Sequence, residues 1–133
     1  MKHHILFINE SKDELLTFLD ALKELPNEDG FKCTYADNPK RALEMLKLLV
    51  PDYIFFDMEM PGMDGLEFLA IIREEPKLKK TKVYFYSSEI SEETYTELMS
   101  GGATGWIQKA DSIERLVIKL KIFIGMGSRP ALR

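Results

Sequence analysis

The sequence predicts an α/β fold in which a five-stranded parallel sheet is covered by helices on both faces. Short apolar segments typical of strands alternate along the chain with segments whose apolar residues recur at helical spacing. Such alternation indicates crossover connections, which place helices on both faces of a parallel sheet. Because these crossovers are right-handed and 133 residues are too few for a barrel, a doubly wound three-layer αβα sandwich is the simplest topology.

Five segments have the composition of strands. The first, third and fourth are short apolar runs, as expected of strands buried on both faces, and the second alternates as a half-exposed strand does. In chain order, we expect strands at Ile5–Ile8, Phe31–Ala36, Tyr53–Phe56, Val83–Tyr86 and Thr104–Gln108.

Each strand is followed by a segment with helical periodicity. Ser11-Lys12-Asp13-Glu14 has the S-x-x-E spacing of a capping box, and Asn38-Pro39 supplies a cap and a first-turn proline for the second helix. The helices are expected at about residues 11–24, 39–49, 65–72, 91–99 and 112–124. We therefore expect one domain at residues 1–126 and a frayed tail at residues 127–133.

Composition and charge argue against several classes of protein. The formal charge of -4 and the pI near 5.3 do not suit a nucleic-acid-binding surface, which is normally basic. No apolar run approaches the roughly 20 residues that a membrane span requires, and the amino-terminal segment has no apolar leader. Cys33 is the only cysteine, so it forms no internal disulfide and is expected as a small buried hydrophobe. These features predict a cytoplasmic protein.

Polar side chains follow four of the predicted strands. Asn9 and Glu10 follow the first strand, Asp57 the third, Ser87 the fourth and Lys109 the fifth. Because the carboxyl ends of parallel strands meet at one edge of a sheet, where α/β proteins bind ligands, we expect these side chains to gather there.

The chemistry of this set suits phosphoryl transfer. Two neighbouring carboxylates repel each other, and a divalent cation such as Mg²⁺, which binds oxygen ligands, relieves that repulsion. A carboxylate such as that of Asp57 can then attack a phosphoryl group, while the Lys109 ammonium and the Ser87 hydroxyl hold its oxygens. Taken singly, each residue is more often a helix cap, a turn residue or a solvated charge. Their joint placement favours the functional interpretation.

Two longer motifs resemble those of the receiver domains of response regulators in two-component phosphorelays. The segment Asp57-Met58-Glu59-Met60-Pro61-Gly62-Met63-Asp64-Gly65 resembles the phosphoacceptor segment of that family. The segment Gly102-Ala103-Thr104-Gly105-Trp106-Ile107-Gln108-Lys109 resembles its Gly-Ala, fifth-strand and lysine signature. The resemblance covers residues 4–124 and implies a flavodoxin-like sheet with the strand order 2-1-3-4-5.

The resemblance implies a role for each site residue. Asp57 would accept a phosphoryl group from a phosphohistidine of a histidine kinase or of a histidine phosphotransfer protein, and Lys109 would hold the transferred group. Mg²⁺, or Mn²⁺ in its place, would be held by Glu10, Asp57 and the main-chain carbonyl of Glu59, with Asn9 acting through water.

A conformational switch is implied as well. Ser87 would turn toward the phosphoryl group and vacate space that Trp106 can enter. The face formed by the fourth helix, the fifth strand and the fifth helix would then change its affinity for a downstream protein. Glu59 and Glu89 lie two residues beyond Asp57 and Ser87, and we expect them to influence the lifetime of the phosphoaspartate.

The chain departs from the family pattern at several positions. Asn9 replaces a residue that is commonly acidic, and Glu10 is one methylene longer than the usual Asp. We therefore expect Mg²⁺ binding to be retained but weaker by about 10–100-fold. Ala110 replaces the proline that usually follows the lysine, so a trans peptide bond and a freer loop are expected there. Trp106 is larger than the usual Tyr or His, which favours a partial or outward-biased switch.

Other interpretations explain less of the sequence. Asn9 favours a pseudo-receiver, which binds a partner without being phosphorylated, but intact Asp57, Ser87 and Lys109 oppose it. Asp57-Met58-Glu59 distantly resembles the nucleophile motif of haloacid-dehalogenase-type phosphatases, whose fold places that motif on the first strand. A flavodoxin requires a hydroxyl- and glycine-rich loop after the first strand. We therefore expect a receiver that stands alone or is one piece of a larger protein. It would be monomeric or weakly dimeric, with no enzymatic activity beyond phosphotransfer and autodephosphorylation.

Overall fold

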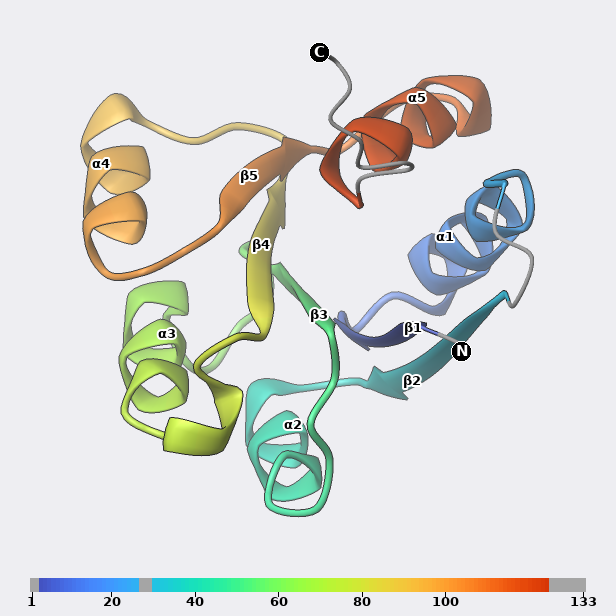
Figure 1. Ribbon diagram of the computed structural model, residues 1–133. Helices are drawn as coiled ribbons and strands as arrows, with labels where there is room; N and C mark the ends of the chain where they lie inside the picture. The colour runs from blue at the N-terminus through green and yellow to red at the C-terminus, as the bar shows by residue number, and fades with distance from the viewer. Residues whose placement is uncertain (1–2, 27–29, 125–133) are drawn as a thin grey trace, which may run out of the picture.

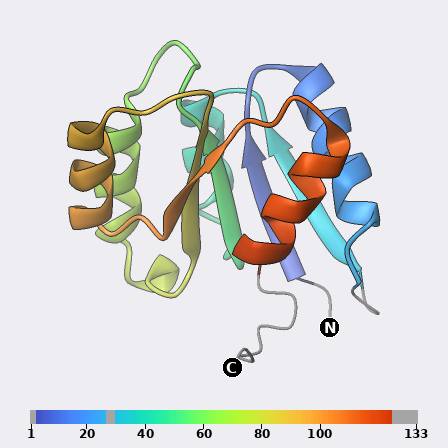
Figure 2. The same cartoon turned by 90° about the horizontal axis from the view of Figure 1, so that it is seen from above.

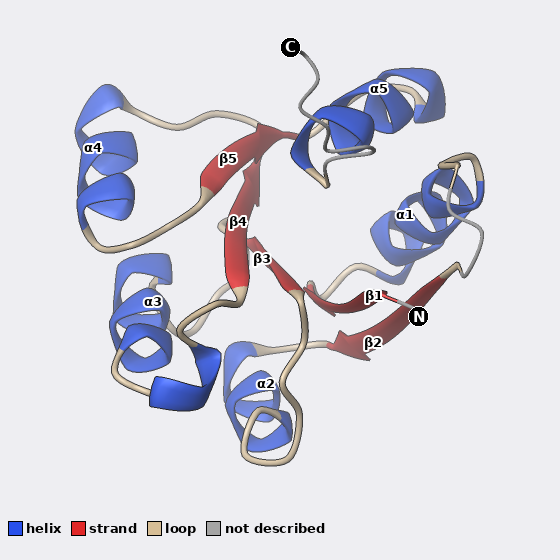
Figure 3. Ribbon diagram, in the orientation of Figure 1, coloured by secondary structure: helices blue, strands red, loops and turns tan. Residues whose placement is uncertain are grey.

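The computed structural model describes residues 3–26 and 30–124, which form a parallel sheet between two layers of helices (Figure 1, Figure 3). The strands lie in the order β2-β1-β3-β4-β5, and each neighbouring pair is parallel. The predicted α/β class and the strand order implied by the resemblance are confirmed. The tail expected at residues 127–133 lies outside the described residues.

The predicted strands and helices are present, with small differences at their ends. The strands are β1 His3–Ile8, β2 Phe31–Ala36, β3 Tyr53–Asp57, β4 Lys82–Ser87 and β5 Gly105–Gln108. The helices are α1 Lys12–Lys23, α2 Pro39–Met45, α3 Gly65–Arg73, α4 Glu92–Ser100 and α5 Ile113–Phe123. A short 3₁₀ helix, η1 (Pro76–Leu78), has no signal in the apolar pattern and carries Leu78 into the core.

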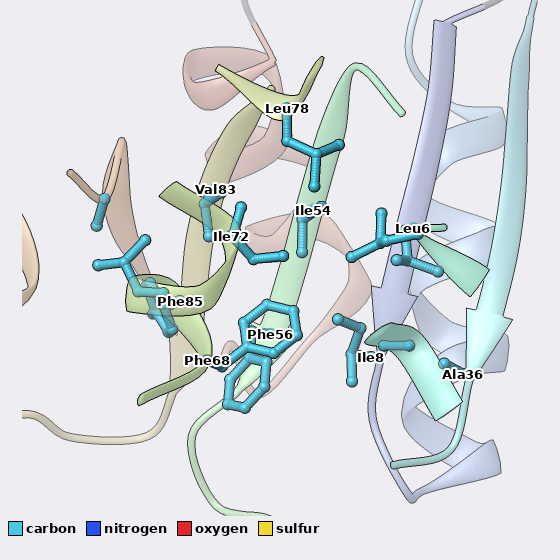
Figure 4. Close-up of a cluster of buried hydrophobic side chains, with 14 of the residues drawn as sticks. Leu6, Ile8, Ala36, Ile54, Phe56, Phe68, Ile72, Leu78, Val83 and Phe85 are labelled. Atoms are coloured by element: carbon cyan, nitrogen blue, oxygen red, sulfur yellow. The ribbon is translucent and has the colours of Figure 1, made fainter. Parts of the chain in front are cut away.

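The two helical layers bury both faces of the sheet. α1 and α5 cover one face, and α2, α3 and α4 cover the other (Figure 1, Figure 2). Alternate side chains of β3 point to opposite faces, with Ile54 and Phe56 beneath α2, α3 and α4, and Phe55 beneath α1 and α5. Figure 4 shows the rings of Phe56 and Phe68, whose centroids lie 4.5 Å apart. This burial on both sides explains why the strand is an unbroken apolar run.

Two tyrosine hydroxyls hold the end of α5 against the sheet. The last carbonyls of a helix have no partner within it. The Tyr53 hydroxyl donates to the carbonyl of Ile124 at 3.1 Å, and the Tyr84 hydroxyl donates to the carbonyl of Phe123 at 2.6 Å. Burial raises the pKa of Tyr84 to about 12, so this hydroxyl keeps its proton at neutral pH.

The helices begin at polar cap residues, which include the predicted Ser11 and Asn38. Four cap side chains accept the backbone N–H three residues further on, namely those of Ser11, Asn38, Ser91 and Ser112. α2 ends at Met45, earlier than the apolar pattern through Leu49 predicts. The chain continues in turns as far as Leu49, whose N–H donates to the Met45 carbonyl, and Pro51 then disfavours helical geometry in Val50 before β3 begins.

Two further features of the described residues bear on the sequence-based expectations. No helix within residues 3–26 and 30–124 has the length and apolar content that crossing a bilayer requires. Cys33 packs at the edge of the core beneath α1, and burial raises the pKa of its thiol to about 12. The thiol therefore stays protonated at neutral pH, as expected of a structural cysteine.

Arg73, at the end of α3, joins the loops at the far end of β4. Its Nε donates to the carbonyl of Gly102 at 3.0 Å, and its two terminal nitrogens donate to the carbonyls of Leu78 (3.0 Å) and Thr81 (2.9 Å). The planar guanidinium suits three separate acceptors in a way that a lysine ammonium does not.

We expect Arg73→Met to lower the free energy of unfolding by about 2–4 kcal/mol, because it leaves three carbonyls without their charged donor. Urea denaturation at pH 7 measures the loss. Arg73→Lys keeps the positive charge but not the planar guanidinium, so its loss of stability should be smaller than that of Arg73→Met but still measurable. A loss within about 0.5 kcal/mol for Arg73→Met, the range of an ordinary surface substitution, would show that these contacts are dispensable.

Candidate functional site

The strand register brings the carboxyl ends of the strands to one edge of the sheet (Figure 2). Ile8, the last residue of β1, pairs with the residue before Asp57, so Asn9 follows beside Asp57. On the other side, the Lys109 N–H donates to the Ser87 carbonyl at 2.9 Å, which extends the pairing of β4 and β5 beyond the end of β5. The structure thus places these four predicted residues along one edge.

Asp57 is a buried carboxylate with a close positive partner. Its side chain is only 4% exposed, and its Oδ1 lies 3.0 Å from the Lys109 Nζ. The N–H of Glu59 donates to the same oxygen at 3.0 Å, which folds the loop after β3 back over the strand end. A carboxylate that is removed from water requires such partners to remain ionised.

Lys109 is surrounded by three carboxylates. Besides Asp57, its Nζ lies 2.9 Å from Glu59 Oε1 and 3.2 Å from Glu14 Oε1. Burial alone would lower the pKa of Lys109, but the hydrogen bonds to Glu59 and Asp57 outweigh it and hold the pKa above its ordinary value. One ammonium against three carboxylates leaves an excess of negative charge at this edge of the sheet.

The Glu59 side chain connects the loops after β3, β4 and β5. Its Oε2 accepts hydrogen bonds from the Ser88 N–H at 2.8 Å and from the Ser87 hydroxyl at 3.2 Å, while its Oε1 accepts from Lys109. The Lys109 hydrogen bond is the main reason that the pKa of Glu59 falls to about 2, with burial opposing it. The sequence analysis gave Glu59 a main-chain carbonyl role at the metal and an influence on phosphoaspartate lifetime, but it did not anticipate these side-chain contacts.

Glu14 is a site residue that sequence reasoning missed. In a capping box the glutamate would accept the N–H of Ser11, but that N–H donates instead to the Asn9 Oδ1 at 2.8 Å. The Glu14 carboxylate is thereby released to contact Lys109 and to accept from the Asn9 Nδ2 at 2.7 Å. Its position in the first turn of α1, directly after β1, is the signal that places it at the same edge.

Asn9 is fully buried and uses both ends of its carboxamide in these two hydrogen bonds. An aspartate cannot donate, so the neutral side chain is what allows a carboxylate from α1 to approach. The expected loss of negative charge at position 9 is therefore offset by the charge of Glu14.

Glu10 lies apart from this cluster. Its side chain is exposed, and its charge acts on Tyr35, whose pKa is raised first by burial, then by Asp37 and then by Glu10. Among residues 3–26 and 30–124, no three Asp, Glu, His or Cys side chains are arranged to hold a metal ion. The structure therefore does not bring the Glu10 side chain to Asp57, and its role as a metal ligand remains a prediction.

Trp106 lines a hollow of about 430 Å³ between α4 and the end of α5. Tyr95 of α4 and Phe123 of α5 form two of its walls. The indole Nε1 is buried and finds no hydrogen-bond partner among the described residues. The described residues contain no cis peptide bond, which agrees with the expectation for Ala110.

Comparison with known proteins decides the family. The model of the response regulator receiver domain matches residues 12–121. The chain belongs to this family. The resemblance to receiver domains, the flavodoxin-like fold and the receiver function predicted from the sequence are confirmed. The pseudo-receiver alternative gains no support over them. Receivers of this kind are signalling domains that interact with histidine kinases and with downstream targets.

Individual relatives agree with the family assignment. The receiver is 35% identical over 113 residues to the chemotaxis protein CheY-3 of Vibrio cholerae, an alignment that spans 84% of this chain and 87% of CheY-3. The structure of CheY4 of Vibrio cholerae is 26% identical, with a TM-score of 0.78 over 92% of this chain and 99% of CheY4. The phosphorylated cyanobacterial phytochrome response regulator RcpA has a TM-score of 0.82 over 98% of this chain and 100% of its own, and at 20% identity it supports the fold alone.

We expect Asn9→Asp to destabilise the receiver by about 1–3 kcal/mol in the absence of divalent cations, because it removes a donor and sets a buried carboxylate against the partly exposed carboxylate of Glu14. Urea denaturation at pH 7 with a chelator measures this change. The double variant N9D/E14Q should recover most of the loss, since it restores an amide to the pair. A single variant as stable as the parent would contradict the contact between Asn9 and Glu14.

Proposed function

We propose that Asp57 of this receiver accepts a phosphoryl group from a phosphohistidine and that the resulting charge changes the surface around α4, β5 and α5. The observation that supports this most directly is the contact between Asp57 and Lys109 at the end of β3. The contacts from the Glu59 N–H and from Lys109 both fall on Oδ1 of Asp57. Oδ2 therefore has no hydrogen bond or ion pair among the described residues.

In the proposed step, Asp57 Oδ2 attacks the phosphorus atom while the bond from phosphorus to the histidine nitrogen breaks. The electron pair of that bond returns to the imidazole, and an acyl phosphate forms on Asp57. The Lys109 ammonium holds one phosphoryl oxygen, and the Ser87 hydroxyl donates to another. The donor protein would be a histidine kinase or a histidine phosphotransfer protein.

The donor atoms suit a divalent cation. Receiver domains typically bind Mg²⁺, and the groups here are carboxylate, amide and carbonyl oxygens, the ligands that Mg²⁺ and Mn²⁺ prefer. Asp57, Glu10 and the main-chain carbonyl of Glu59 would hold the ion, with Asn9 acting through water, and Glu10 would turn inward from its exposed position. The bound cation would offset the negative charge that Lys109 leaves uncompensated.

The proposed output is a change on the face that carries Trp106. The phosphoryl group would carry about -1.5 to -2 of charge in place of the charge of the Asp57 carboxylate, and a hydrogen bond from Ser87 to it would draw the loop before α4 inward. Ser87 currently donates to the Glu89 carbonyl and to Glu59, so it would exchange these partners. The hollow beside Trp106, whose Nε1 has no partner among the described residues, is the place where the indole can move.

The proposal extends to the setting of the protein. We place it in the cytoplasm, as a monomer or weak homodimer that binds no nucleic acid, with a downstream protein docking on α4, β5 and α5. The net charge of -4 and the single protonated Cys33 support this setting. The domain would perform no catalysis beyond its own phosphotransfer and autodephosphorylation.

We expect the receiver, incubated with Mg²⁺ and acetyl phosphate, to gain the mass of one phosphoryl group and to change its tryptophan fluorescence. Trp106 is the only tryptophan, so the fluorescence change can be assigned without ambiguity. Asp57→Asn should abolish both signals, and Lys109→Arg should slow the mass gain by roughly 10-fold or more, because the ammonium position is lost. A phosphoryl group found on the Asp57→Asn variant would disprove the assignment.

A further inference from the structure

We infer that the Glu59 carboxylate is a tethered competitor of the phosphoryl group, which must be displaced before Asp57 can be phosphorylated. This inference rests on the proposed function and adds a device that regulates the same site.

The partners of Glu59 are the groups that a phosphoryl group on Asp57 would need. Lys109 donates to its Oε1 at 2.9 Å, and the Ser87 hydroxyl donates to its Oε2 at 3.2 Å. The Ser88 N–H donates to Oε2 at 2.8 Å. An ammonium, a hydroxyl and a backbone N–H together form a site for a multi-oxygen anion, and an internal carboxylate occupies that site in the unphosphorylated protein.

The backbone of Glu59 explains why its side chain lies there. Its N–H donates to Asp57 Oδ1 at 3.0 Å, which turns the loop back over β3 and directs the side chain across the strand ends toward β4 and β5. The Lys109 ammonium, 2.9 Å from its Oε1, holds the carboxylate in this position. A glutamate reaches these donors, whereas a side chain one methylene shorter does not.

The tether is reversible. The Glu59 side chain is 42% exposed, whereas that of Asp57 is 4% exposed. Swinging the carboxylate outward therefore moves it into water and buries nothing new. The incoming phosphoryl group would take over the three donors, and the two anions cannot occupy them at once because like charges repel. Glu59 should therefore slow phosphorylation and favour the unphosphorylated conformation.

Two substitutions distinguish occupation of the three donors by the Glu59 carboxylate from a general effect of its negative charge on phosphorylation. Glu59→Asp keeps the charge but withdraws the carboxylate from its three donors, and Glu59→Gln keeps the length but loses the charge. If Glu59 competes for the donors, both variants should be phosphorylated by acetyl phosphate and Mg²⁺ about fivefold faster or more than the parent, as expected for lost charge-assisted hydrogen bonds at a partly exposed position. Glu93→Gln, on the exposed first turn of α4, removes one negative charge elsewhere and should leave the rate unchanged.

Amide hydrogen exchange of Ser88 gives a readout that needs no phosphorylation. Because Glu59 accepts the Ser88 N–H, both Glu59 variants should exchange this amide several-fold faster than the parent, whereas the Glu93→Gln protein should not.

The outcomes distinguish this inference from the proposed function. Rates of phosphorylation equal to the parent, unchanged Ser88 exchange, or acceleration in Glu59→Gln but not in Glu59→Asp would each overturn the competition. If neither the parent nor any variant gains a phosphoryl group on Asp57, the proposed function fails and the competition fails with it.

Discussion

The ion pair between Lys109 and Asp57 is the interaction on which the site depends. A carboxylate that is 4% exposed has lost most of its contact with water, and the lysine that follows β5 supplies a compensating cation at 3.0 Å. The sheet makes this possible, because parallel pairing across β3, β4 and β5 sets residues far apart in the sequence at one level. Glu14 and Glu59 are arranged around the same ammonium.

The surplus of carboxylates around Lys109 gives the site its chemical character. Neutral Asn9 does not leave the site poor in charge, because its amide positions the carboxylate of Glu14, which comes from α1. Compared with receivers that carry an acidic residue at the position of Asn9, the negative charge here comes from the first turn of a helix and not from the end of a strand. A helix N-terminus also favours an acidic side chain, so the same placement stabilises α1.

The fold and the strand-end residues could be predicted because they depend on backbone pattern. Apolar runs such as that of β3, buried on both faces, fix where each strand ends, and the residue after the run then lies at the sheet edge. Directions of long side chains are not encoded in that pattern. Glu14 has the spacing of a capping box, and only the competing bond from Ser11 to Asn9 shows that its carboxylate goes elsewhere. Glu59 and Glu10 likewise differ in direction for reasons that lie in loop geometry rather than in composition.

The indole of Trp106 carries an N–H that is buried without an acceptor among the described residues. This N–H has lost its hydrogen bond to water and has no protein acceptor in its place. The structure around Trp106 is therefore less stable than it would be with the hydrogen bond made. A movement of the indole that brings this N–H to water or to an acceptor would relieve that deficit. Burial of this donor without an acceptor thus lowers the free energy needed to move the Trp106 side chain out of its present position.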